Sequence, residues 1–456
     1  MNTHLLNTKT LQSTLLCAGT AALLLAPVSS NGQSSDALID KLVEKGILTV
    51  KEANQLREES DKGFTAAYAA KSGMSDWVSA LKFNGDFRGR YEGFYRDDSS
   101  FVDRNRFRYR LRFGVTANMA ENFEVGMRLA SGDATASGGL IDPISANQTF
   151  DNNGANKGIY IDAAYAKWSP VNTPEWSGSL TFGKMDNPFV FSEMVFDSDY
   201  TPEGLASQWT YNLSPEQALK FHVGGFVLDE IGSSSRDPFL LGAQARWDAA
   251  WNQHLSSSIG LAGLVISGKD GLNGGTATSS SPVPDINVGN TRGPGGQLLN
   301  HFNPVIADAA LVYMLESFPY YTGALPIRAG GEFMHNPGAS DNNNAYAFGL
   351  TFGKAGKRKT WEVGYRWKVL ESDAWYEELV DSDSGAFYAS SFPNSNQRSG
   401  YRSGTNIRGH TFKAAYSPYD FLTLAATYYL FEAINEVPSG SGSSIGRLQL
   451  DASLKF

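Results

Sequence analysis

The stretch RNRFRYRLRFGVTANM, Arg104 to Met119, has two different faces when every second residue is read together. One face is aromatic and aliphatic and consists of Phe107, Tyr109, Leu111, Phe113, Val115, Ala117 and Met119. The other face includes the arginines Arg106, Arg108, Arg110 and Arg112. A period of two is typical of a β-strand and not of a helix.

These two faces restrict the kind of fold that the strand can join. Guanidinium groups buried without partners cost too much free energy for an ordinary β-sandwich, so the charged face is predicted to be wet. An apolar face against lipid and a charged face toward water satisfy both demands, provided that the backbone groups pair within a closed sheet. The stretch therefore predicts a transmembrane β-barrel with an aqueous interior.

The same alternation recurs along the chain and predicts an all-β, antiparallel, up-and-down barrel. About sixteen strands are expected, with fourteen and eighteen as alternatives: Lys82–Tyr95, Arg104–Met119, Phe123–Leu129, Tyr160–Trp168, Leu180–Met185, Ser207–Leu213, Leu219–Leu228, Phe239–Asp248, Leu255–Ile266, Val305–Leu315, Ile327–Met334, Tyr346–Phe352, Trp361–Val369, Ile407–Tyr416, Leu422–Phe431 and Arg447–Phe456. Short turns alternate with long polar loops, as in outer-membrane barrels. A bulge or a shifted register is expected near Lys184 and Ser207.

Residues 1–30 have the pattern of a secretory signal peptide, with an apolar run from Leu11 to Pro27 and a cleavage site after Ser30. The alternative, a membrane anchor, is disfavoured because polar residues interrupt this run. The only cysteine, Cys17, lies in this segment, so the mature chain is expected to have no disulfide.

Residues 31–76 are predicted to form a short periplasmic α-helical segment and a linker, and residues 77–456 the barrel. Leu38, Ile39, Leu42 and Val43 fall on one face of a first short helix. This segment could pack on the barrel or on its copies, or contact the cell wall, and the sequence does not choose between these roles.

The chain ends on an aromatic residue, Phe456, which continues the apolar face of the last predicted strand. An edge strand that ends at the membrane interface places such a ring in the aromatic girdle and closes against the first strand. The ending also resembles the membrane-insertion signal that the barrel-assembly machinery of Gram-negative bacteria reads.

Several segments together resemble the bacterial putative porin family. They are DALIDKLVEKGILTVKEANQLREE, the arginine-rich strand followed by FEVGMRLASGD, FGKMDNPF followed by VFDSDYTPEGLA, and the LQLDASLKF ending. The resemblance implies a channel for small hydrophilic solutes in the outer membrane of a Gram-negative bacterium. It also implies a homotrimer surrounded by outer-membrane lipid, and it names no solute.

The segment from Met185 to Ala206 is too long and too apolar for a simple exposed loop. By analogy with porins it is predicted to fold into the lumen as a constriction loop, with four carboxylates opposite the arginines: Glu193, Asp197, Asp199 and Glu203. Opposed rows of charge would set up a transverse field. The alternative is an outward loop whose Asp-Ser-Asp pattern forms a turn or a loose calcium site.

The pore-lining arginines allow two interpretations; they are Arg88, Arg90, Arg106, Arg108, Arg110 and Arg112. As a free ladder they would attract anions such as phosphate or carboxylate groups. Alternatively they pair with Asp86, Glu92, Glu124 and Asp162 and hold the wall in register, which leaves a permissive pore.

Other classes of function have less support. The chain contains no HExxH or phosphate-loop motif, and its histidines are scattered, so we predict no enzyme, no cofactor and no metal. A formal net charge of -9 excludes a pervasive basic field for nucleic acid. The remaining alternatives are a channel specific for phosphate, carboxylate or sugar, and a non-conducting structural or adhesive barrel.

Overall fold

The computed structural model describes residues 75–96, 103–133, 144–232, 235–272, 289–293, 297–384, 404–435 and 444–456. The predicted signal peptide and the helical segment lie outside these ranges, so both stay predictions. Among the described residues, no helix has the length and apolar character needed to cross a membrane.

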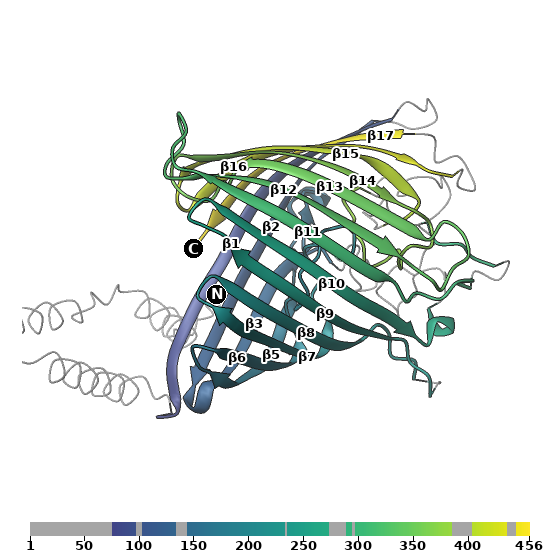
Figure 1. Ribbon diagram of the computed structural model, residues 1–456. Helices are drawn as coiled ribbons and strands as arrows, with labels where there is room; N and C mark the ends of the chain where they lie inside the picture. The colour runs from purple at the N-terminus through teal and green to yellow at the C-terminus, as the bar shows by residue number, and fades with distance from the viewer. Residues whose placement is uncertain are drawn as a thin grey trace, which may run out of the picture. The chain divides into compact units, whose positions relative to one another are not determined.

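Sixteen long strands and one two-residue strand form a single sheet (Figure 1). The strands are β1 (Val78–Arg96), β2 (Arg104–Met119), β3 (Phe123–Gly132), β4 (Gln148–Thr149), β5 (Gly158–Asn172), β6 (Trp176–Lys184), β7 (Glu203–Ser214), β8 (Gln217–Val227), β9 (Phe239–Ala250), β10 (Leu255–Ser267), β11 (Val305–Leu315), β12 (Leu325–His335), β13 (Asn344–Gly353), β14 (Thr360–Leu370), β15 (Ile407–Tyr419), β16 (Leu422–Ala433) and β17 (Ser444–Lys455).

The sheet closes on itself. Each long strand pairs antiparallel with the next one along the chain, and β17 pairs with β1, while the short β4 adds to β2. The predicted fold class and the count of sixteen barrel strands are thus confirmed. The bulge expected near Lys184 and Ser207 is wrong, because β6 and β7 pair without interruption from Trp176 opposite Tyr211 to Lys184 opposite Glu203.

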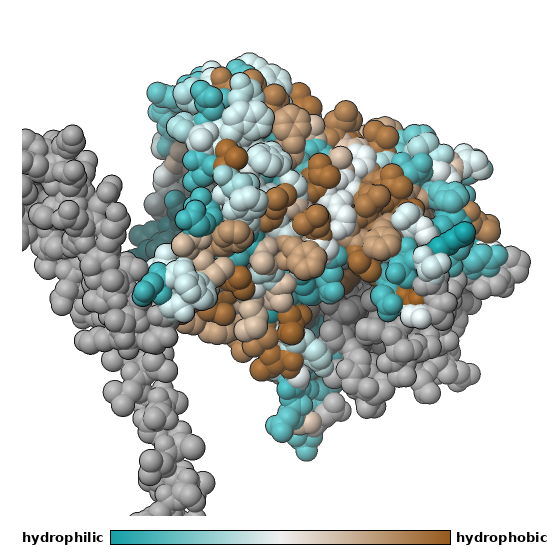
Figure 2. Space-filling model, turned by 90° about the horizontal axis from the view of Figure 1, so that it is seen from below, coloured by the Kyte–Doolittle hydropathy of each residue, from teal (hydrophilic) through white to brown (hydrophobic). Residues whose placement is uncertain are grey.

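Alternate residues of the strands point to opposite sides of the wall, and the two sides differ in chemistry. On β2, Phe107 is 58% exposed while its neighbour Arg108 is 2% exposed. The outward side chains are mainly aromatic and aliphatic, and Figure 2 shows them gathered over the strands, with hydrophilic residues toward the ends. An apolar outer face is what a barrel in lipid requires.

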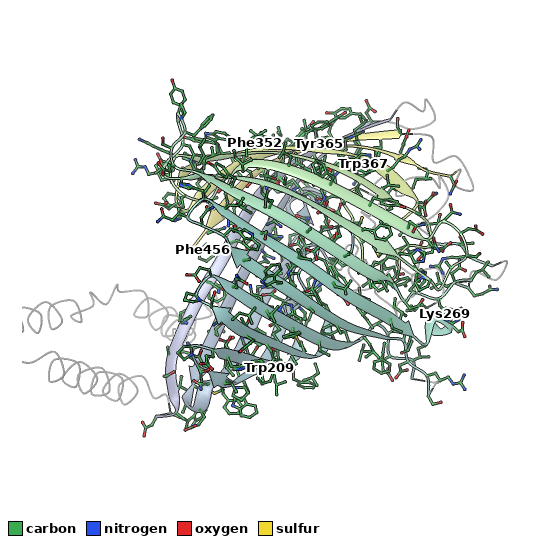
Figure 3. All side chains as sticks on the ribbon, viewed as in Figure 1. Trp209, Lys269, Phe352, Tyr365, Trp367 and Phe456 are labelled. Atoms are coloured by element: carbon green, nitrogen blue, oxygen red, sulfur yellow. The ribbon has the colours of Figure 1, made fainter. Side chains whose placement is uncertain are left out.

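Connections are short at one end of the barrel and long at the other. Residues 120–122, 173–175 and 215–216 make tight turns, whereas residues 133–157, 185–202, 268–304 and 371–406 are long connections. Phe456 lies at the end with the short turns, and Lys269, in a long connection, lies at the opposite end (Figure 3).

The last residue takes part in closing the barrel. The Phe456 carbonyl accepts a hydrogen bond from the Gly85 amide at 2.9 Å, and the Phe456 amide donates to the Gly85 carbonyl at 3.1 Å. The Phe456 ring covers Gly85 so closely that a Cβ at this position would lie 2.4 Å from a ring carbon. Glycine is therefore needed in β1 for the terminal ring to lie flat on the wall.

If the outward face meets lipid, a charged residue introduced at its centre should strongly destabilise the barrel. Leu261, on β10, is 58% exposed and points outward. Leu261→Arg should lower the free energy of unfolding in lipid vesicles by about 2–4 kcal/mol. Tyr320→Arg, in the turn between β11 and β12, serves as the control and should change little. Equal effects of the two variants in denaturant titrations would show that this face does not meet lipid.

Candidate functional site

The connection between β6 and β7, residues 185–202, folds into the barrel and is called the inner loop here. Met194 and Val195 are completely buried. The Val190 amide donates to Gln244 Oε1 of β9 at 2.9 Å, and Ser192 Oγ donates to Glu332 of β12. Contacts with the inward faces of several strands place this loop in the lumen.

A second segment, residues 371–384 after β14, packs against the inner loop and was not predicted from the sequence. Trp375 Nε1 donates to the Val195 carbonyl at 2.9 Å, and the Asp197 amide donates to the Leu379 carbonyl at 2.8 Å. The signal that could have found it is an apolar run, Ala374 to Tyr376, within a connection longer than that of the inner loop.

A third piece of chain holds this second segment in place. The Asn290 amide donates to Glu377 Oε2 at 2.7 Å, and Arg292 forms an ion pair with the same carboxylate. The Thr291 amide donates to Asp373 Oδ1 at 2.9 Å. Three connections that are distant in sequence thus pack together inside one end of the barrel.

The inward arginines are gathered around one buried carboxylate, Glu92 on β1, which is 0% exposed. Its oxygens lie 2.5 Å from Arg106 Nε and from Arg447 Nη2, 3.5 Å from Arg90 Nη1 and 3.8 Å from Arg108 Nη1. The charged face is therefore buried here and is not bathed in water as the sequence analysis expected. Carboxylates replace water as its partners.

The two arginines at the other end of the row share a different pair of carboxylates. Arg110 and Arg112 lie 3.1 and 2.7 Å from Asp86, on the neighbouring strand β1. They also lie 2.7 and 3.5 Å from Asp199 of the inner loop. This arrangement matches the pairing interpretation for Asp86 and adds a contact between the loop and the wall.

Two other expected partners bind elsewhere. Asp162 pairs with Arg128, and Glu124 accepts a hydrogen bond from the Tyr165 hydroxyl at 2.8 Å. Arg88 differs from the rest of the row: it donates to Asn147 Oδ1 at 2.8 Å, and within the described part of the chain no carboxylate lies at ion-pairing distance.

Of the four loop carboxylates predicted to face the arginine row, only Asp199 reaches it. Glu193 binds Arg366 of β14 and not the arginine row. Asp197 is buried and accepts hydrogen bonds from the amides of Asp199 and Ser382 at 2.9 and 3.1 Å. Glu203 begins β7 and pairs with Lys184 at 3.1 Å. The prediction of a single acidic row is corrected accordingly.

The contact between the inner loop and the second segment brings carboxylates together. Burial raises the pKa of Asp197 well above its usual value, and the nearby Asp381 adds to the shift. Burial also raises the pKa of Asp381, against the attraction of Lys368. Burial opposes the ionisation of Asp383 as well. The attraction of Arg447 and other nearby cations is larger than this effect, so the pKa of Asp383 is lowered. Asp383 thus keeps its charge more readily than its two neighbours.

Two cavities remain inside the barrel beside the inner loop. The larger, about 470 Å³, lies among the loop, the second segment and the strands β13 to β17 and β1. Its charged lining residues are the cations Arg88, Arg90, Arg366 and Lys413 and the carboxylates Glu193, Asp197, Asp199, Glu362, Asp381, Asp383 and Asp451. The smaller, about 400 Å³, lies between the loop and β9, β11, β12, β13 and β14.

These linings are suited to polar solutes. Hydroxyl groups, carboxylates and guanidinium groups converge on both cavities, and two phenylalanine rings, Phe191 and Phe196, line the smaller one. In the described ranges, no group of three or more potential ligands is placed to hold a metal ion.

The buried charge cluster predicts a large effect of removing its centre. Glu92→Gln leaves the surrounding guanidinium groups without their shared counter-charge and should lower the free energy of unfolding by about 3–5 kcal/mol. Glu432→Gln, which breaks an exposed ion pair with Arg408, is the matched control and should cost less than about 1 kcal/mol. Denaturant titrations of both variants in lipid vesicles measure the difference, and equal losses would contradict the central role of Glu92.

Comparison with known proteins agrees with a porin-type barrel. A family model described as putative porin matches residues 95–264. No curated protein matches the chain in sequence. The high-pH structure of Pseudomonas putida OprB is similar in fold, with a TM-score of 0.50 and 12% identity, over 87% of this chain and 97% of that one.

Two further solved structures overlap the barrel more loosely. The loop L8 deletion mutant of OmpT, an outer membrane protein of Vibrio cholerae, has a TM-score of 0.45 and 10% identity over 83% of this chain and 99% of its own. Pseudomonas aeruginosa OccK8 (OprE) has a TM-score of 0.43 and 7% identity over the same shares. The resemblance to the putative porins is thus confirmed over residues 95–264, and the chain has a porin-type barrel fold.

Proposed function

We propose that the protein is a porin of the bacterial outer membrane through which small hydrophilic solutes diffuse passively. One observation carries this proposal: a closed barrel with an apolar outer face encloses cavities lined by charged and hydroxyl groups. The apolar face suits lipid, and the interior suits water and polar solutes. The match to putative porins favours a channel over an enzyme.

The ion preference of this pore depends on charges that line the cavities. A free arginine row would make the pore prefer anions. Most of that row is paired and buried. The larger cavity has seven acidic residues and four cations in its lining, and five carboxylates remain when Asp197 and Asp381, whose pKa burial raises, are left out. We therefore propose a weak preference for cations. Anion preference is the second candidate. The observation that favours it is Arg88, whose hydrogen-bond partner among the described residues is the side-chain amide of Asn147.

Biogenesis and assembly follow the same proposal. Residues 1–30 would direct export, and Phe456, whose backbone pairs with Gly85 at the closing seam, would serve as the signal for the barrel-assembly machinery. Outer-membrane lipid would surround the apolar face. A homotrimer rests on the resemblance alone. We propose no specific transport of phosphate, carboxylate or sugar, because the described residues form no site that is dedicated to one of these solutes.

Single-channel recording in a planar bilayer with a KCl gradient tests the pore and its preference. The purified protein should give stable current steps and a reversal potential that modestly favours potassium. Arg88→Gln should shift this potential further toward potassium, because it removes a cation from the lining of the larger cavity. Arg408→Gln removes an equal charge from an exposed pair outside both cavity linings and should leave the potential unchanged.

Two results would contradict this account. A wild-type reversal potential that favours chloride, abolished by Arg88→Gln, would establish the second candidate. Folded, heat-modifiable protein without conductance would remove the pore and leave a structural or adhesive barrel.

A further inference from the structure

The two cavities meet at one place, and an ion pair lies there. The residues that line both are Glu193, Ser198, Gly349, Thr351 and Arg366. Glu193 belongs to the inner loop and Arg366 to β14, and Arg366 Nη1 lies 2.5 Å from Glu193 Oε2. The pair therefore reaches from the loop to the wall at the boundary between the cavities.

Glycines without side chains line the barrel wall beside this pair. Gly349 lies directly opposite Arg366 in the β13–β14 register, and Gly330 lies opposite Gly349 on β12. A Cβ at Gly349 would meet only ordinary contacts, at 3.7 Å from the Tyr365 carbonyl oxygen and 3.9 Å from Arg366 Cγ. Glycine at this site therefore leaves open space and is not required by close packing.

The pair is accessible and weakly held. The side chains of Glu193 and Arg366 are each 30% exposed, in contrast to the buried cluster around Glu92. Arg366 Nε is buried and has no hydrogen-bond partner among the described residues, so this guanidinium retains an unused donor. A partly exposed ion pair contributes less free energy than a buried network and can exchange its partners.

We propose that the Glu193–Arg366 pair is a gate between the two cavities and that zwitterionic solutes, such as free amino acids, open it most readily. An uncharged solute that separates the pair offers neither side chain a new partner. A simple ion compensates only one of them. A zwitterion compensates both, because its carboxylate pairs with Arg366 while its ammonium group pairs with Glu193.

The hydroxyl groups at the same boundary suit this assignment. Ser198 and Thr351 line both cavities beside the pair, so they can accept from an ammonium group or donate to a carboxylate during passage. The gate rests on the proposed function, since it requires that solutes pass through the lumen.

Osmotic swelling of liposomes that contain the full mature protein tests the gate with two solutes of similar size, zwitterionic L-serine and uncharged erythritol. Wild-type protein should admit serine about threefold faster than erythritol, a ratio in keeping with a partly exposed ion pair. Glu193→Gln and Arg366→Gln should bring the ratio close to one. The exchanged pair, Glu193→Arg with Arg366→Glu, should restore the preference, because a zwitterion can still compensate both charges.

A second pair of variants locates the path. Gly349→Phe should fill the boundary and slow both solutes several-fold. Gly263→Phe is the matched control, because Gly263 lies on the outward face of β10 with open space around it, and swelling should not change. Heat-modifiability in detergent establishes that each variant is folded.

The outcomes separate the gate from the proposed function. A serine-to-erythritol ratio that stays the same in wild type and in both single variants overturns the gate, while swelling itself would still support the porin. Gly349→Phe without effect on either solute would also overturn it. Folded wild-type protein that admits neither solute would contradict the proposed function directly.

Discussion

The structure depends on the requirement that every peptide group inside a bilayer be paired within the protein. Lipid offers no hydrogen bonds, so a sheet in the membrane can have no free edge. The pairing of β17 with β1 removes the last edge, and the Phe456 backbone extends this pairing to the end of the chain. Alternation of side chains then follows from the pleat, with apolar residues outside and charged residues inside.

Closing the barrel creates a second constraint, because charged side chains must now be satisfied in a confined interior. The inner loop and the second segment contact the inward arginines of β1, β2 and β17, and most of these arginines are buried. Glu92, Asp86 and Asp199 provide the compensating charge. The wall and the loops are therefore linked by ion pairs, and two cavities lie beside the loop.

What the sequence can reveal depends on how local the information is. The alternation in Arg104–Met119 is local, and β2 has the same bounds as the predicted strand. The Glu92–Arg447 contact joins residues 355 positions apart, and no local pattern indicates it. Asp199 could be placed opposite the arginines by analogy with porin loops. The partner of Asp197 depends on how residues 371–384 fold, and Glu193 binds Arg366 of β14, which is distant in sequence.

The central claim is that water and solutes pass beside the inner loop, and thiol labelling measures this most directly. The only cysteine, Cys17, lies in the predicted signal peptide, so a cysteine introduced at Ser198 would be unique in the mature protein. Ser198 is exposed and lines both cavities. A charged, water-soluble thiol reagent should lower the single-channel current of Ser198→Cys in a step and leave Gly263→Cys unchanged. An unaltered current after complete labelling at Ser198 would contradict the account.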